Sequence, residues 1–277
     1  MAATQRPAES QRSEIERALE EAGRLVDSDP LAAARLAEAA IETNRHDPQR
    51  VRLQLLAGRA RLEHEQALDD LSHSPEAFAQ RRRELDEEAR AHRSQYRRSQ
   101  PAGIWLYNGY HFREILRGFP ESDLADDAAY ELTRLTFAGE CEGSIPCHVK
   151  AELEPLLGFL ERFPQSELAP QAIIRANEAF TNNLYLRGRA QPVPIVDLRA
   201  KAAGYDPREV ERLLARYTAV ASSLPPPTRA HAFETIADLW ERMGDREKAL
   251  ELYTFIVRNV PDYPNLDEIG RRIRRLS

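Results

Sequence analysis

Residues 115–128 read Ile-Leu-Arg-Gly-Phe-Pro-Glu-Ser-Asp-Leu-Ala-Asp-Asp-Ala, and residues 159–172 repeat this pattern as Phe-Leu-Glu-Arg-Phe-Pro-Gln-Ser-Glu-Leu-Ala-Pro-Gln-Ala. The shared core Phe-Pro-x-Ser-x-Leu-Ala returns 44 positions later. Residues 256–266 carry a weaker third copy, Ile-Val-Arg-Asn-Val-Pro-Asp-Tyr-Pro-Asn-Leu. An internal repeat of this length is typical of arrays of small helical units.

Each copy has the features of a connection between two helices. An apolar helix end is expected at Phe119, Phe163 or Val260, and the proline that follows stops that helix. Ser122 and Ser166 are placed to cap the next helix. Because one such unit cannot bury its apolar face alone, we expect the units to stack into a solenoid.

Helical periodicity extends over most of the remaining chain. Ile15, Leu19, Ala22 and Val26, for example, recur at steps of three or four residues. Asp29-Pro30 then has the form of an N-cap followed by a first-turn proline. Residues 48–72 and 75–99 read as two longer helices, and 208–221 as another. No alternating run is long enough for a sheet, so the sequence predicts an all-α protein.

The predicted organisation has two parts. Residues 1–100 form an N-terminal helical region, in which the two longer helices project as an antiparallel pair. Residues 101–277 form the repeats, with an insertion near 187–206. The segment Leu266–Leu276 is expected to be a C-terminal capping helix with its isoleucines inward and its arginines outward, and contact with an anionic surface is the alternative function of this helix.

The last repeat has the spacing of a tetratricopeptide (TPR) repeat. The residues at the packing positions are Phe233, Ile236, Ala237, Trp240, Ala249, Tyr253 and Pro261. Leu53, Leu56, Ala57 and Ala60 fit the first helix of a further repeat. Small Ala237 and Ala249 allow two helices to approach closely on either side of the hinge Met243-Gly244-Asp245. The prediction is a TPR-like right-handed superhelix, an α-solenoid of helical hairpins.

Residues 104–187 contain an aromatic-Pro-x-Ser connection followed by an Ala-rich helix. In this they resemble the helical repeats of bacterial outer-membrane assembly lipoproteins and of Tol–Pal-associated lipoproteins. The resemblance extends with gaps over residues 104–277. It implies a protein-binding scaffold in cell-envelope assembly. The first seven residues contain no apolar segment, so a periplasmic or envelope location requires that a leader has been removed, and the chain is otherwise expected in the cytoplasm.

Charge and hydropathy limit the classes of partner. The net charge is −6 and the pI is near 5.8, whereas proteins that bind phosphate backbones usually carry a basic excess. No stretch approaches the roughly 20 apolar residues of a membrane span. We therefore expect another protein or a peptide as the partner, with no nucleic acid, no membrane span and at most a peripheral association with the envelope.

The candidate chemical groups do not form a catalytic or metal site. Cys141 and Cys147 lie in a glycine- and proline-containing stretch, and a disulfide between them is the favoured interpretation for an oxidising compartment. Two reduced thiols, or a metal or haem site, are the alternatives. The seven histidines are scattered and match no zinc or catalytic motif. The sequence thus predicts neither an enzyme nor a bound cofactor or metal.

The first helix of each TPR hairpin lines the concave side of a stack, and its residues between the packing positions are expected to face a partner. These groove residues are Asp127, Tyr130, Arg134 and Phe137, then Gln171, Ile174, Glu178 and Thr181, then His231, Glu234, Asp238 and Glu241. An exposed apolar row there favours peptide recognition. A non-enzymatic scaffold is the main hypothesis; a cytoplasmic TPR adaptor or cochaperone and a helical domain of an enzyme are the alternatives.

Overall fold

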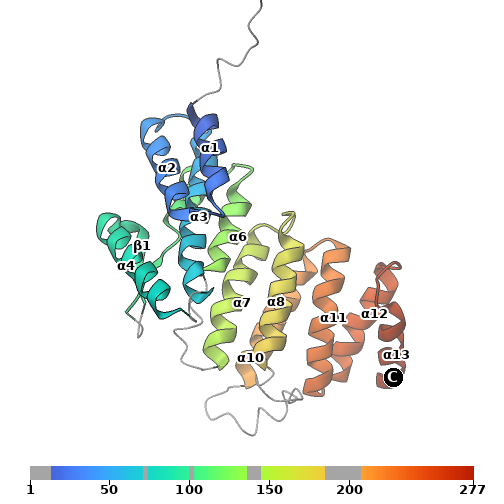
Figure 1. The fold of residues 1–277 in the computed structure, drawn as a ribbon. Coiled ribbons are helices and arrows are strands. Elements are labelled where there is room, and N and C mark those ends of the chain that lie inside the picture. Colours follow the sequence, from blue (N-terminus) through green and yellow to red (C-terminus); the bar gives the residue numbers. More distant parts are fainter. Residues whose placement is uncertain (1–13, 71–73, 100–102, 136–144, 185–206) are drawn as a thin grey trace, which may run out of the picture. The chain divides into compact units, whose positions relative to one another are not determined.

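The computed structural model describes residues 14–70, 74–99, 103–135, 145–184 and 207–277 (Figure 1). The described residues contain twelve α-helices, one short 3₁₀ helix and two short strands. The expectation of a mostly helical chain is confirmed. The expectation that it contains no sheet is wrong.

Contacts divide the chain into two units, Met1–Leu135 and Thr136–Ser277. The boundary expected near residue 100 therefore falls inside the first unit. The reason is that α5 (Tyr110–Gly118) and α6 (Ala125–Arg134) pack against α3 (Arg50–Asp70) of the N-terminal region.

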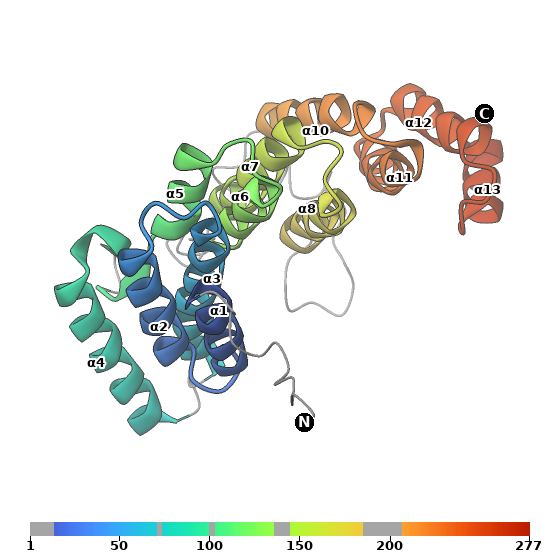
Figure 2. The same ribbon diagram turned by 90° about the horizontal axis from the view of Figure 1, so that it is seen from above.

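The centre of the first unit is α3. It packs against α5, α6, α1 (Glu14–Leu25) and α2 (Pro30–Thr43) (Figure 2). The surfaces between α2 and α3 are rich in alanine: Ala33, Ala34, Ala37, Ala57 and Ala60 are all fully buried. Side chains this small let the helix backbones approach closely. At the start of α2 the Asp29 carboxylate accepts the Ala32 amide at 3.0 Å, which confirms the predicted N-cap.

The helix predicted over 75–99 is shorter than expected. Helix α4 (Pro75–Ala91) is followed by the 3₁₀ turn η2 (Arg93–Gln95) and by β1 (Tyr96–Arg98), which pairs antiparallel with β2 (Trp105–Tyr107). Each strand has three residues, which is too short for an alternating pattern to be recognised in the sequence. The expected projecting pair of helices is also wrong for its first member, because α3 lies at the centre of the unit.

Two tyrosines anchor this hairpin in the core. Tyr96 lies opposite Tyr107 in the ladder, both side chains are buried, and their rings meet edge to face at 6.2 Å. Burial of two aromatic rings gives the hairpin more stability than three-residue strands have by themselves.

The second unit consists of six described helices. They are α7 (Ile145–Arg162), α8 (Ala169–Leu184), α10 (Pro207–Ser222), α11 (Pro226–Met243), α12 (Arg246–Asn259) and α13 (Leu266–Leu276). Besides packing on their neighbours in the sequence, α8 contacts α11 and α7 contacts α10. Alternate helices thus contact each other in two layers (Figures 1 and 2).

The hairpin α11–α12 has the predicted packing residues in its core. Ala237, Ala249 and Tyr253 have no exposed surface, and Phe233 and Trp240 are each 5% exposed. Gly244 ends α11 in the left-handed conformation, with φ at 86°, which a glycine adopts without a steric penalty. The predicted hinge and the burial of its flanking positions are confirmed.

The three repeated connections have the same backbone hydrogen bonds. In each connection the amide of the fourth residue donates a hydrogen bond to the carbonyl of the first, at 3.0–3.1 Å. The three bonds run from Ser122 to Phe119, from Ser166 to Phe163 and from Tyr263 to Val260. Both serine hydroxyls accept the amide two residues later, at 3.2 and 3.1 Å. The serines therefore close the turn before the helix, whereas the sequence predicted that they would cap the helix itself.

Candidate functional site

The predicted groove residues lie on α6, α8 and α11, and the three rows have different surroundings. Phe137 lies outside the described residues, and the side chain of Thr181 is not described. The remaining residues can be compared with the expectation of an open groove.

On α6 the row faces α3 of the same unit. The Arg59 guanidinium donates to Asp127 and to the buried Glu131, each at 2.7 Å, and Arg134 donates to Glu63 at 2.8 Å. Burial alone would lower the pKa of Arg134. The hydrogen bond to Glu63 and the charge of Glu131 outweigh burial, so the pKa of Arg134 lies above its ordinary value. Asp127 and Arg134 thus join two helices within the unit, and their part in a partner-binding groove stays a prediction.

On α11 the row faces the C-terminal helix. We call Glu234, Asp238 and Glu241 the acid row. Arg272 of α13 donates to Asp238 at 2.6 Å and to the Tyr253 hydroxyl at 2.8 Å, and Arg275 forms an ion pair with Glu241. Two acids of the row are therefore neutralised by this chain's own arginines.

The other end of the same row contacts the connection before α13. The Tyr263 hydroxyl donates to Glu234 at 2.6 Å, and the Asn265 amide donates to the same carboxylate at 3.0 Å. The ring of His231 meets Tyr263 edge to face at 5.1 Å. All four predicted groove residues of α11 are thus in contact with residues 263–275 of this chain, and their contact with an external partner stays a prediction.

On α8 the row is accessible to solvent. Gln171, Ile174 and Glu178 are all exposed, and Ile174 has 55% of its surface exposed. Among the described residues, the exposed large apolar side chains are Ile174 and Val257, the latter with 42% of its surface exposed. Of the described residues in the three predicted rows, Ile174 of α8 is the large aliphatic side chain that is exposed.

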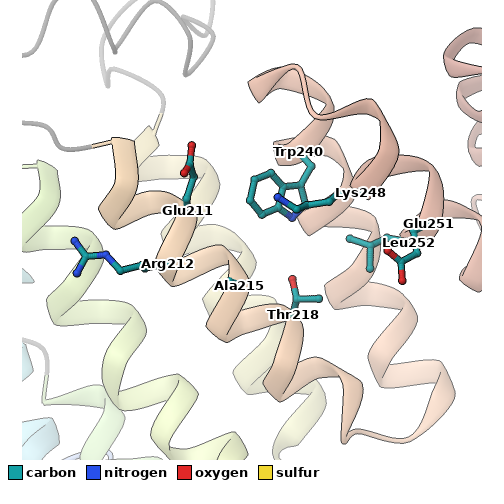
Figure 3. Close-up of a pocket in the computed structure, with 8 residues that line it drawn as sticks. All are labelled: Glu211, Arg212, Ala215, Thr218, Trp240, Lys248, Glu251 and Leu252. Atoms are coloured by element: carbon teal, nitrogen blue, oxygen red, sulfur yellow. The ribbon is translucent and has the colours of Figure 1, made fainter.

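The sequence did not predict a cleft in the second unit, which we call the Trp240 cleft (Figure 3). It has a volume of about 880 Å³. Its lining residues are Glu211, Arg212, Ala215 and Thr218 on α10, Trp240 on α11, and Lys248, Glu251 and Leu252 on α12. Trp240 and Leu252 supply the large apolar side chains.

The two walls differ in their side chains. On α10 small Ala215 and Thr218, three residues apart, leave room beside the helix (Figure 3). On α12 the Lys248 ammonium lies 3.9 Å from the centre of the Trp240 ring and forms an ion pair with Asp245 at 2.8 Å. Trp240 was expected to fill a hairpin, and it does so. The small residues of α10 were the available signal that one side of its ring borders open space.

The first unit contains a buried polar cluster that the sequence also did not predict. Arg61 on α3 is fully buried and donates to Glu38 at 2.6 and 3.0 Å, to the Tyr96 hydroxyl at 3.0 Å, and to Glu88. Glu88 is also paired with Arg35. Burial raises the pKa of Glu88, but the two arginines outweigh burial and hold it below its ordinary value. The cluster therefore joins α2, α3, α4 and β1.

A neutral histidine extends the cluster. The Tyr107 hydroxyl oxygen accepts the His111 amide at 2.9 Å, and the same hydroxyl is hydrogen-bonded to Nδ1 of the His111 ring, also at 2.9 Å. The other ring nitrogen, Nε2, lies 3.4 Å from Glu38. Burial lowers the pKa of His111 to about 4, although Glu38 acts in the opposite direction. Because these groups are enclosed, their arrangement serves the fold of the first unit and offers no open site.

Other predicted features have limited structural evidence. Cys141 lies outside the described residues, and Cys147 lies in α7 but its side chain is not described, so the disulfide stays a prediction. Within the described ranges no group of three or more His, Cys, Asp or Glu residues is placed to hold a metal. No described helix is both long and apolar enough to cross a membrane.

Comparisons with known proteins identify no family. No protein-family model matches the chain, and no curated protein matches it. The resemblance to TPR proteins therefore rests on the spacing of the sequence and on the helix packing described above.

Proposed function

We propose that this chain is a non-enzymatic, TPR-like scaffold that binds another protein or a peptide. The observation that carries the proposal is the Trp240 cleft. Its volume of about 880 Å³ is in the range of ligand-binding clefts, which combine an apolar lining with a few polar groups. Trp240 and Leu252, although largely buried, form the apolar floor of the cleft, and small Ala215 and Thr218 leave it open, while charged side chains on both walls provide hydrogen-bonding groups.

The TPR-like assignment has two independent supports. The three repeated connections share one hydrogen-bond pattern, and the packing positions predicted for α11 and α12 are buried. Helix pairs that repeat in this way stack into extended scaffolds, whose usual role is to bind other proteins. The cell-envelope setting is the part of the proposal that rests on the sequence resemblance alone.

The proposal can be tested by site-specific photocrosslinking in the native host. A benzoylphenylalanine at Ala215, inside the cleft, is expected to capture a defined protein. The matched control is Ala219, which is also exposed and lies one turn further along α10 but does not line the cleft. Capture of one partner from position 215 and not from 219 supports the proposal.

A second measurement links this capture to the cleft itself. The long side chain in Ala215→Arg fills the space beside Trp240, so it is expected to abolish co-purification of the captured partner, while Ala219→Arg leaves co-purification intact. Equal capture at both positions, or co-purification that is indifferent to Ala215→Arg, contradicts the proposal.

A further inference from the structure

The contact between α13 and the acid row defines what kind of helix this surface binds. Asp238 and Glu241 are one turn apart on α11, and each is paired with an arginine of α13, Arg272 and Arg275, which are also one turn apart. The two acids of α11 are therefore in register with the two arginines of α13.

The same contact is formed elsewhere in the chain at equivalent repeat positions. When the connections at Phe119 and Val260 are aligned, Glu131 and Arg134 of α6 correspond to Arg272 and Arg275 of α13. Glu131 and Arg134 form ion pairs with α3, as the two arginines of α13 do with α11. In both places the charged residues of one helix pair with opposite charges on the other helix. The acid row of α11 pairs in this way with two arginines of α13.

The contact of α13 is partly exposed to solvent. The Arg272 and Arg275 side chains are 27% and 63% exposed, and Ile269 is the buried residue of this helix. Exposed ion pairs contribute little to stability. Pro261 and Pro264 interrupt the helical chain immediately before α13. A helix with few buried contacts opens more readily than a core helix.

We propose that the acid row is a docking surface for a basic amphipathic helix of a partner protein, and that α13 occupies it in the absence of that partner. The partner helix has the pattern of α13: an apolar residue in the place of Ile269, followed three and six residues later by arginines. Charge complementarity argues for this occupant, since a helix with acids at these positions would be repelled by Asp238 and Glu241. The proposal is independent of the Trp240 cleft.

The test uses the full chain and a fluorescein-labelled peptide of residues 262–277, with binding measured by fluorescence anisotropy. The opened variant carries Arg272→Glu and Arg275→Glu, which turn α13 away from the acid row. The matched control carries Arg271→Glu and Arg274→Glu, an equal change of charge on α13. Arg271 pairs with Glu268 of the same helix, and the Arg274 side chain is exposed.

The opened variant is expected to bind the peptide at least tenfold more tightly than the unmodified chain or the control does. Binding should weaken as salt is added, because exposed ion pairs are screened. Asp238→Lys with Glu241→Lys in the opened variant should abolish binding of this peptide. In the unmodified chain, excess peptide should accelerate hydrogen exchange within residues 266–276, because it displaces α13.

Three results would overturn the proposal. The first is equal affinity of the opened variant and the control. The second is tight binding that the acid-row reversal leaves unchanged. The third is a doubled mass of the opened variant in light scattering without peptide, because that would assign the surface to a second copy of this chain. Circular dichroism of each variant shows that the remaining helices are folded, so a loss of binding is not mistaken for unfolding.

Discussion

Replacement of Arg61 by methionine is expected to destabilise the first unit strongly. The change keeps an apolar side chain of similar length and removes the cation that pairs with Glu38 and Glu88. Glu88 is only 4% exposed, so it would be left buried with a single remaining partner, Arg35, whose side chain is 60% exposed. Breaking a buried ion pair in this way costs about 3–5 kcal/mol. For a unit of this size the melting temperature should fall by roughly 10–20 °C.

Each unit has its own fluorescent reporter for this measurement. Trp105 lies on β2 of the first unit and Trp240 on α11 of the second, so urea unfolding in a Trp240→Phe background follows the first unit alone. The control is Arg24→Met. Arg24 pairs with Glu20 on the surface of α1 and its side chain is 73% exposed, so the expected change is below about 0.5 kcal/mol.

A double variant separates loss of the ion pair from loss of packing. If the uncompensated charge of Glu88 is the cause, Arg61→Met with Glu88→Leu should be more stable than Arg61→Met alone, because the most deeply buried carboxylate of the cluster is then absent. A loss of less than about 1 kcal/mol in Arg61→Met would refute the reasoning, since the network would then contribute no more than a surface pair.

Further predictions concern pH, packing and the cysteines. Burial and the nearby arginines lower the pKa of His64 to about 4, so the unfolded chain takes up a proton near pH 6.5 and the folded chain does not. Burial lowers the pKa of His111 equally, so each of these two histidines should reduce the stability of the first unit by up to about 3 kcal/mol as the pH decreases from 6.5 to 4, measured by urea unfolding. Trp240→Ala should cost about 3–5 kcal/mol, and Ala249→Phe about 1–3 kcal/mol by overpacking, and a melting temperature like that of the unmodified chain for both would refute the packing of α11 on α12. If the protein works in an oxidising compartment, a thiol count on denatured, unreduced native protein should find no free Cys141 or Cys147; two free thiols would favour the cytoplasm instead.

The sequence was sufficient where local patterns determine the structure. The limits of α13 and the hinge at Gly244 follow from helix stop signals and apolar spacing, and both were predicted correctly. The β-hairpin was missed because three-residue strands carry no periodic signal. Tyr96 continued the spacing of α4, and only its burial beside Tyr107 makes the strand favourable.

The predicted groove shows why surfaces are harder to predict than elements. Spacing correctly placed Asp127 and Asp238 away from the apolar core of their hairpins, but it could not indicate which helix lies opposite them. Arg59 and Arg272, their partners, are 68 and 34 positions away in the sequence. Position on a helix therefore predicted polar contact, whereas the identity of the partner depended on packing.

The repeated connection accounts for the similar ion pairs of α6 and α13. A connection that returns with the same hydrogen bonds brings each new helix to an equivalent place, so residues at equivalent positions meet similar neighbours. Arg134 and Arg275 occupy such positions, and each pairs with a carboxylate on a neighbouring helix, Glu63 of α3 or Glu241 of α11. The charges at these positions can change without altering the fold, because they lie outside the apolar core. Selectivity between neighbouring helices therefore resides in a few side chains, and charge reversal at the acid row should change which helix binds while leaving the hairpins folded.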